Sequence, residues 1–184
     1  MKTWLAAMLL VACVLTGCQS PQAMPPVQGV ASTRNNCYSL LHQLLDEQKD
    51  VSFLRFIKHE DSDVKKLVQK IAAASGAGSA LLEDLAKHDP SLSLDYIGLP
   101  PGEVATRDAI ASTKKKELLG HTGDEFELAL LLTQTEALSY AWHLAKVAGE
   151  NDSQPNRALA LAGLSKDMEN LYHEVFVMLL AKTK

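Results

Sequence analysis

Apolar residues recur at every third or fourth position through most of the chain from residue 36 onward, and alternating runs bounded by turns are absent. This spacing gathers the apolar side chains on one face of an α-helix. It predicts a first helix over 36–58, with Gln48 on its solvent side, and a second helix that begins at Asp61 or Ser62 and stops before Pro90. The chain is therefore expected to be all-α.

Small residues fill positions 72–80 of the second helix and include two glycines. A glycine inside a helix costs about 1 kcal/mol relative to alanine, so the stretch must either pack closely or break the helix. Because the apolar register continues in phase on both sides, we expect an unbroken helix in close contact with a neighbour, so that a large side chain at Gly76 would be destabilising. A break that leaves a flexible loop is the alternative.

Proline and glycine are frequent in 89–102, which predicts a long crossing loop. Its apolar residues, Leu92 to Leu99, are expected to lie against the bundle, where the loop could also form a partner surface. A more polar third helix is expected over 103–119, with Lys114 to Lys116 in solvent. Four of its apolar residues are expected to face inward: Val104, Ile110, Leu118 and Leu119.

Thr122 and Glu125 have the spacing of a capping box. The helix that follows, over 126–148, is apolar almost all round and is expected at the centre of a bundle. After Gly149, Pro155 opens a last helix. Its core-facing residues are expected to be Leu159, Leu161, Leu164, Met168, Leu171, Val175, Met178 and Leu179. The predicted architecture is a bundle of four to five helices in one domain, residues 36–184.

The N-terminal residues have a different pattern. Lys2 precedes an apolar run from Trp4 to Leu15, which is too short to span a bilayer and typical of a signal peptide. The run ends in Leu-Thr-Gly-Cys, which resembles a bacterial lipobox. The resemblance implies a lipoprotein signal peptide over 1–17 and acylation, including palmitate, of Cys18. An ordinary cleaved signal peptide is the alternative.

Two or more acyl chains on Cys18 would make membrane anchoring effectively permanent. By resemblance to known lipoproteins, Gln19 rather than an aspartate after the cysteine implies sorting to the outer membrane. Residues 18–35 are rich in proline, glutamine, serine and glycine, which predicts a lipidated flexible tether. We expect the folded domain in the periplasm.

Composition narrows the possible partners. The formal net charge of −4 becomes about −5 when Lys2 is removed, so nucleic acid is not expected as a partner. Cys13 would leave with the signal peptide and Cys18 would carry lipid. Cys37 is then the remaining thiol, interpreted as a small apolar residue of the first helix, with pairing between molecules as the alternative.

Over about 56–180 the packing and capping patterns at 63–70, 81–86, 124–126 and 134–137 resemble those of a bacterial domain family of unknown function. That family is a ferritin-like periplasmic four-helix bundle, often found in predicted outer-membrane proteins. The resemblance implies an up-down arrangement of helices. The chain departs from the family at three positions where a histidine is usual: Ser75, Leu138 and Asn170.

Ferritin-like bundles with a di-iron site use glutamates and Glu-x-x-His pairs, and no Glu-x-x-His occurs in this sequence. Weak metal candidates remain, which could bring a carboxylate and an imidazole together across the core: Glu136, His143, Glu169 and His173. Hydrogen-bonded, partly buried imidazoles are the alternative. His42 is interpreted as structural, and no metal or other cofactor is expected.

No nucleophile elbow, evident catalytic base or phosphate-binding glycine loop is present, so we expect no catalytic residues and no enzyme. The leading functional hypothesis is an interaction or assembly module that binds another envelope protein, with the loop from Leu92 to Leu99 as its surface. The alternative is a periplasmic carrier that holds a metal or a small apolar ligand within the bundle, where 72–80 would leave room.

Overall fold

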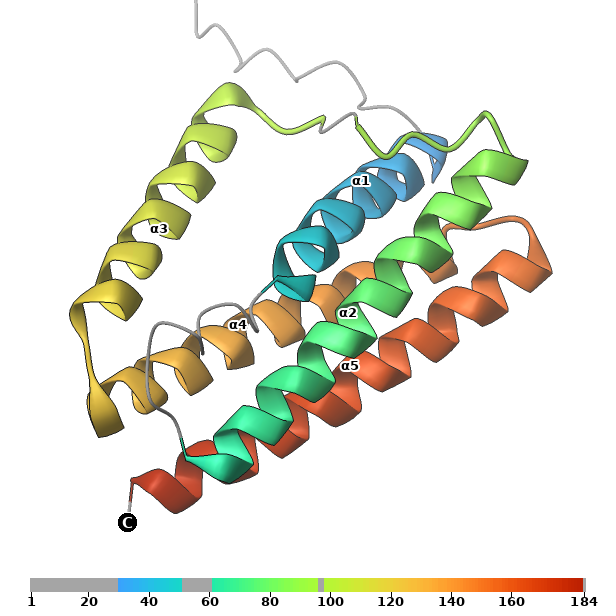
Figure 1. Ribbon diagram of the computed structural model, residues 1–184. Helices are drawn as coiled ribbons and strands as arrows, with labels where there is room; N and C mark the ends of the chain where they lie inside the picture. The colour runs from blue at the N-terminus through green and yellow to red at the C-terminus, as the bar shows by residue number, and fades with distance from the viewer. Residues whose placement is uncertain (1–29, 51–60, 96–97, 184) are drawn as a thin grey trace, which may run out of the picture.

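The computed structural model describes residues 30–50, 61–95 and 98–183 and is all-helical over those residues, with five helices and no strand (Figure 1). The helices are α1 (Val30–Lys49), α2 (Ser62–His88), α3 (Pro101–Gly120), α4 (Gly123–Glu150) and α5 (Pro155–Lys182). The predicted fold class, an all-α bundle of four to five helices, is confirmed. Within the described residues, no helix has both the length and the hydrophobicity needed to cross a membrane.

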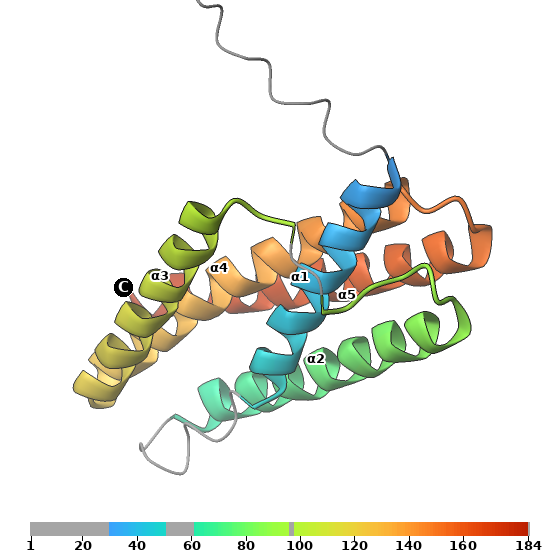
Figure 2. The same cartoon turned by 90° about the horizontal axis from the view of Figure 1, so that it is seen from above.

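Four helices, α1, α2, α4 and α5, make the core, and α3 lies outside it. α4 and α5 pack against each other most extensively, α1 packs on both α2 and α4, and α2 also contacts α5. α3 packs mainly on α4 and stands apart from the other three (Figures 1 and 2). Successive helices run in opposite directions, so a long connection and α3 together join the end of α2 to the start of α4.

α2 has the bounds that the sequence predicts and runs unbroken through 72–80. Asp61 caps it by accepting a hydrogen bond from the Asp63 amide at 2.9 Å. The close contact, however, lies at Gly78 rather than at Gly76. A Cβ at Gly78 would lie 2.8 Å from Leu45 and 2.9 Å from Leu164, whereas one at Gly76 would meet Lys49 at an ordinary 3.7 Å.

α1 begins at Val30, six residues before the predicted helix start at residue 36. The polar residues of its first turns hold the crossing loop. Asn35 donates to the Ser91 carbonyl at 3.0 Å, and Ser39 donates to the Ser93 carbonyl at 2.7 Å. Residues 51–58, the predicted end of the first helix, lie outside the described residues.

The crossing loop lies against the bundle, as predicted. Leu92 is buried in the core, and Leu94 packs against it. Tyr96 and Ile97 lie outside the described residues. Leu92 and Leu94 are therefore committed to the chain's own core, whereas Leu99 is only partly buried and lies outside it.

Two predictions about side chains near α3 and α5 are wrong. Of the four apolar α3 residues expected to face inward, only Leu118 is buried; Val104, Ile110 and Leu119 are 36%, 51% and 45% exposed. The core is already filled by the other four helices. Leu159 of α5 is 74% exposed because it lies two residues before Leu161, on a different face of the helix from the buried residues.

The start of α4 is as predicted, but the capping box does not form. Thr122 occupies the N-cap without a side-chain hydrogen bond to the helix. Glu125 instead approaches His121, with Oε2 3.3 Å from Nδ1. The preceding loop therefore takes the carboxylate that the capping box requires.

A buried ion-pair network closes one end of the bundle. Arg157 of α5 donates two hydrogen bonds of 2.8 Å to Asp152, whose side chain is fully buried, and also binds Asp89 after α2. Tyr38 of α1 donates to Asp152 at 2.9 Å. Burial alone would raise the pKa of Asp152, but the hydrogen bonds, chiefly those from Arg157, outweigh it and lower the pKa.

A second network closes the other end. Glu127 of α4 is buried, accepts a hydrogen bond from the Asp61 amide and binds Lys182 of α5 at 2.6 Å. Lys182 also lies 3.3 Å from the Asp61 carboxylate. The start of α2, the start of α4 and the end of α5 are therefore held together.

The two glycines of α2 predict opposite effects of the same substitution. Gly76→Ala should raise the melting temperature, since alanine is favoured in a helix by about 0.5–1 kcal/mol and the space is open. Gly78→Ala should lower it, because Leu45 and Leu164 must shift to admit the methyl group and overpacking costs about 1–3 kcal/mol. Thermal unfolding followed by circular dichroism tests both. Equal effects at the two positions would contradict the close contact at Gly78.

Asp89 predicts a pH-dependent stability. Hydrogen bonds from Ser91, and then Arg157, lower its pKa from 3.8 to about 2, so its contribution is present above pH 3.8 and lost as the pH falls through about 2. The difference in melting temperature between the wild type and Asp89→Asn should therefore narrow from pH 5 to pH 2. Asp167→Asn, on the exposed side of α5, controls for loss of a surface charge. A difference that stays constant over this range would contradict the prediction.

Candidate functional site

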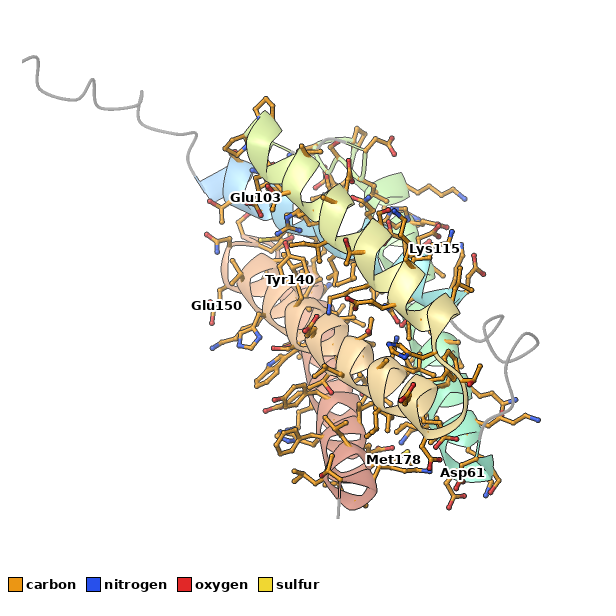
Figure 3. All side chains as sticks on the ribbon, turned by 90° about the vertical axis from the view of Figure 1, so that its left-hand side faces the viewer. Asp61, Glu103, Lys115, Tyr140, Glu150 and Met178 are labelled. Atoms are coloured by element: carbon orange, nitrogen blue, oxygen red, sulfur yellow. The ribbon has the colours of Figure 1, made fainter. Side chains whose placement is uncertain are left out.

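A groove of about 460 Å³ lies between α3 and the helices α1 and α4. Its apolar wall includes Leu44 of α1, Ile110 and Leu118 of α3 and Ala137 of α4. Figure 3 looks onto this side of the molecule, with α3 across the front and Tyr140 of α4 beside it. The groove exists because α3 packs mainly on α4 and leaves the adjoining side of α1 uncovered.

α4 supplies the groove with a buried glutamine. The residues of α4 that face the core recur at intervals of three and four: Glu127, Leu131, Gln134, Leu138, Ala141, Ala145 and Ala148. Gln134 therefore occupies a core position of a helix whose other core residues, apart from Glu127, are apolar. It is only 2% exposed, and it lines the groove.

α1 supplies a second glutamine by the same rule. Gln48 follows the buried residues Tyr38, Leu41 and Leu45 at the next core interval. It is half-buried and lines the groove from the side opposite α3. The prediction that Gln48 belongs to the solvent side of the helix is therefore wrong.

Both glutamines carry a side-chain oxygen without a partner. Gln48 Oε1 and Gln134 Oε1 are buried and have no hydrogen-bond partner among the described residues; Ser75 Oγ of α2 is the third such atom. An unsatisfied buried acceptor costs about 1–3 kcal/mol. The buried Glu127, by contrast, is paired with Lys182. The groove thus contains hydrogen-bonding capacity that the described part of the protein leaves unused.

Arg107 and Tyr140 form a wall within the groove. Arg107 of α3 donates a hydrogen bond to the Tyr140 hydroxyl, and its guanidinium carbon lies 4.7 Å from the centre of the Tyr140 ring. Both residues also line an adjoining hollow of about 190 Å³ that extends toward Leu99 and Val104. This contact joins α3 to α4 where the groove meets the adjoining hollow.

The charged groups around the groove balance in number, with three basic and three acidic side chains among its lining residues. Lys114 of α3 binds Glu136 of α4 at 2.5 Å, and Arg107 binds Glu103 at 2.9 Å. The sequence pattern indicated that Lys114 lies in solvent, but the structure pairs it with Glu136. The groove presents no excess of either charge.

The candidate metal residues do not converge across the core. Glu136 is held by Lys114 on the groove side of α4. His143 is exposed, packs on Trp142 with ring centres 4.3 Å apart, and donates from Nδ1 to the Ser139 carbonyl at 2.7 Å.

The other two candidates lie on α5. Glu169 binds Lys166 at 2.8 Å, and this hydrogen bond lowers the pKa of Glu169. His173 is exposed, with its ring edge against Tyr172. Glu169 is therefore paired on its own helix, while His173 makes ring contacts with Tyr172 and with Trp142 of α4.

A different set of possible metal ligands lies between α1 and α2. Within the described part of the chain, one group of three brings its ligand atoms within 4.8 Å of one another: His42, Asp46 and Glu83. His42 Nε2 lies 3.3 Å from Glu83 Oε1. Asp46 is ion-paired with Lys49, whose hydrogen bond lowers the pKa of that carboxyl. A cation would have to compete with Lys49, so the contacts are those of an ion-pair cluster.

Of Cys18 and Cys37, the structure describes only Cys37. Cys37 is buried in the core, and burial raises the pKa of its thiol. It packs as the small apolar residue that the sequence indicated. Cys18 and the signal segment 1–17 lie outside the described residues.

Comparison of the sequence with known protein families gives no match, and comparisons with curated proteins and with solved structures give none either. The arrangement of the helices and the chemistry of the groove therefore carry the functional argument.

Sequence reasoning identified neither glutamine as a site residue. In the sequence, Thr133 to Glu136 is a polar interruption of an otherwise apolar helix, and nothing in its composition marks a site. The available signal was the core register itself, because Gln134 lies three residues after Leu131 and four before Leu138. The groove was not predictable in this way, because it depends on how far α3 stands from α1.

Proposed function

We propose that the protein is a membrane-anchored carrier that holds a small, mainly apolar molecule in the groove beneath α3. The observation that carries the proposal is the side-chain oxygen of Gln134, a residue of the groove wall. This oxygen is buried and has no hydrogen-bond partner among the described residues. Most buried polar groups in proteins have a hydrogen-bond partner, and one without a partner costs about 1–3 kcal/mol. A groove of about 460 Å³ also lies within the size range of small-molecule sites.

The location of the ligand differs from the one that the sequence suggested. The carrier hypothesis placed the ligand inside the bundle, in room left by the small residues 72–80. In the structure Gly78 approaches the side chains of Leu45 and Leu164 closely, so that space is filled. The room lies instead between α3 and the core helices.

The second candidate function is the envelope interaction module, and the structure changes its support. The loop from Leu92 to Leu99 was its expected surface, but Leu92 is buried and the loop is hydrogen-bonded to α1. Exposed apolar residues on α5 favour this function instead: Phe176, Val177 and Leu180 are 40%, 66% and 49% exposed. The partner would be another envelope protein.

The anchor of the proposed carrier is Cys18. Its support is the lipobox-like Leu-Thr-Gly-Cys quartet after a short apolar segment. Acylation would tie the bundle to the outer membrane, with the bundle on its periplasmic side. A carrier placed there could exchange an apolar molecule with the membrane surface.

A pair of tryptophan substitutions on α3 tests the carrier function. Ala111 lines the groove, whereas Ala109 lies on a different face of the same helix and does not. Ala111→Trp should abolish binding of the fluorescent probe N-phenyl-1-naphthylamine by filling the groove, and Ala109→Trp should leave binding intact. Both are measured on the full chain in lipid nanodiscs, with empty nanodiscs as the blank. Absence of binding to the wild type would contradict the carrier function.

Replacement of the anchor cysteine tests the location. The Cys18→Ser chain should no longer fractionate with the outer membrane, because no acyl chains can be attached. Membrane fractionation followed by immunoblotting measures this, and Cys37→Ser is the matched control that keeps the anchor. Unchanged fractionation of the Cys18→Ser chain would contradict the lipoprotein assignment.

A further inference from the structure

Two residues that line the groove each hold a buried acceptor. Gln134 Oε1 and Gln48 Oε1 are both buried without a partner among the described residues. A carbonyl oxygen of this kind accepts a hydrogen bond from an N–H or O–H group. The complementary group on a bound molecule is therefore a donor.

The charges around the groove argue against a charged ligand. Three basic and three acidic side chains line it, and two of the basic groups, Arg107 and Lys114, are already bound to Glu103 and Glu136. A ligand carboxylate or ammonium would meet groups of both signs. A neutral molecule avoids the cost of removing a charge from water.

The rest of the wall is mainly apolar. Leu44, Ile110 and Leu118 form its larger surfaces, and Ala111 and Ala137 leave space between them. Ile110 is 51% exposed. A hydrophobic ligand surface against these side chains would remove them from water.

We infer that the groove binds a neutral, mainly apolar molecule that carries at least one N–H or O–H group and donates a hydrogen bond to Gln134 Oε1. This inference rests on the proposed carrier function and adds the chemical class of the ligand. The burial of Gln134 makes this hydrogen bond the main source of selectivity between ligands of the same shape, because a ligand that lacks the donor leaves the buried oxygen unsatisfied.

Two probes of the same shape test the inference. N-phenyl-1-naphthylamine joins its rings through an N–H group, and 1-benzylnaphthalene joins them through a methylene group. The full chain in nanodiscs is titrated with the amine, which is then displaced with the hydrocarbon. The Ala111→Trp protein in nanodiscs serves as the blank and corrects for uptake by lipid. The wild type should prefer the amine about two- to tenfold, which is the effect of one neutral hydrogen bond.

Substitution of the acceptor completes the design. Gln134→Met keeps the length of the side chain and removes the acceptor, so the preference for the amine should disappear while the hydrocarbon still binds. The melting temperature of this variant without ligand should rise, since an unsatisfied buried polar group is removed. The same substitution at Gln69, on the exposed side of α2, should leave the preference unchanged.

The outcomes separate the two proposals. The inference is supported if the preference for the amine is lost in Gln134→Met and kept in Gln69→Met. Equal binding of the two probes to the wild type overturns the inference and leaves the carrier function standing. Failure of both probes to bind overturns both.

Discussion

The bundle depends on a salt bridge that is closed off from water. Asp152 is fully buried between α4 and α5, and Arg157 binds it through two hydrogen bonds. Removal of one partner of such a pair costs about 3–5 kcal/mol, so the turn between α4 and α5 is stable only with Arg157 in place. Because Arg157 also binds Asp89 after α2, and Asp152 accepts from Tyr38 of α1, this pair sets the relative positions of all four core helices.

The position of α3 follows from that self-sufficient core. Glu127 and Lys182 fix the opposite end of the bundle, and the four helices between the two networks bury their apolar faces against one another. α3 contributes a single buried residue, Leu118. Its remaining ties are polar contacts to α4, such as those from Arg107 and Lys114. A helix held at its edge by polar side chains leaves a groove beneath it, whereas a helix with a continuous apolar stripe would close the space.

The spacing of apolar residues was sufficient to predict a helix that buries a regular face. It failed where contacts with segments distant in the sequence determine the helix start or the burial of a side chain. It located α2 and α5 and the unbroken helix through Gly78, because local spacing determines them. It missed the start of α1, because Asn35 is polar and its role, binding the crossing loop, is a contact between residues 56 apart. It predicted that Ile110 faces inward, since an apolar residue on a helix favours burial, but no space in the core remained for it.

The groove shows the same division between local and distant causes. The core registers of α1 and α4 already mark Gln48 and Gln134 as polar residues at buried positions, so the conflict between residue type and position is visible in the sequence. What cannot be seen there is that Glu127, an equally anomalous residue, finds Lys182 at the far end of α5, while Gln134 finds no partner among the described residues. An apolar residue at position 134 would make the bundle more stable. The proposed carrier function rests on this acceptor, which a bound molecule with a donor group would satisfy.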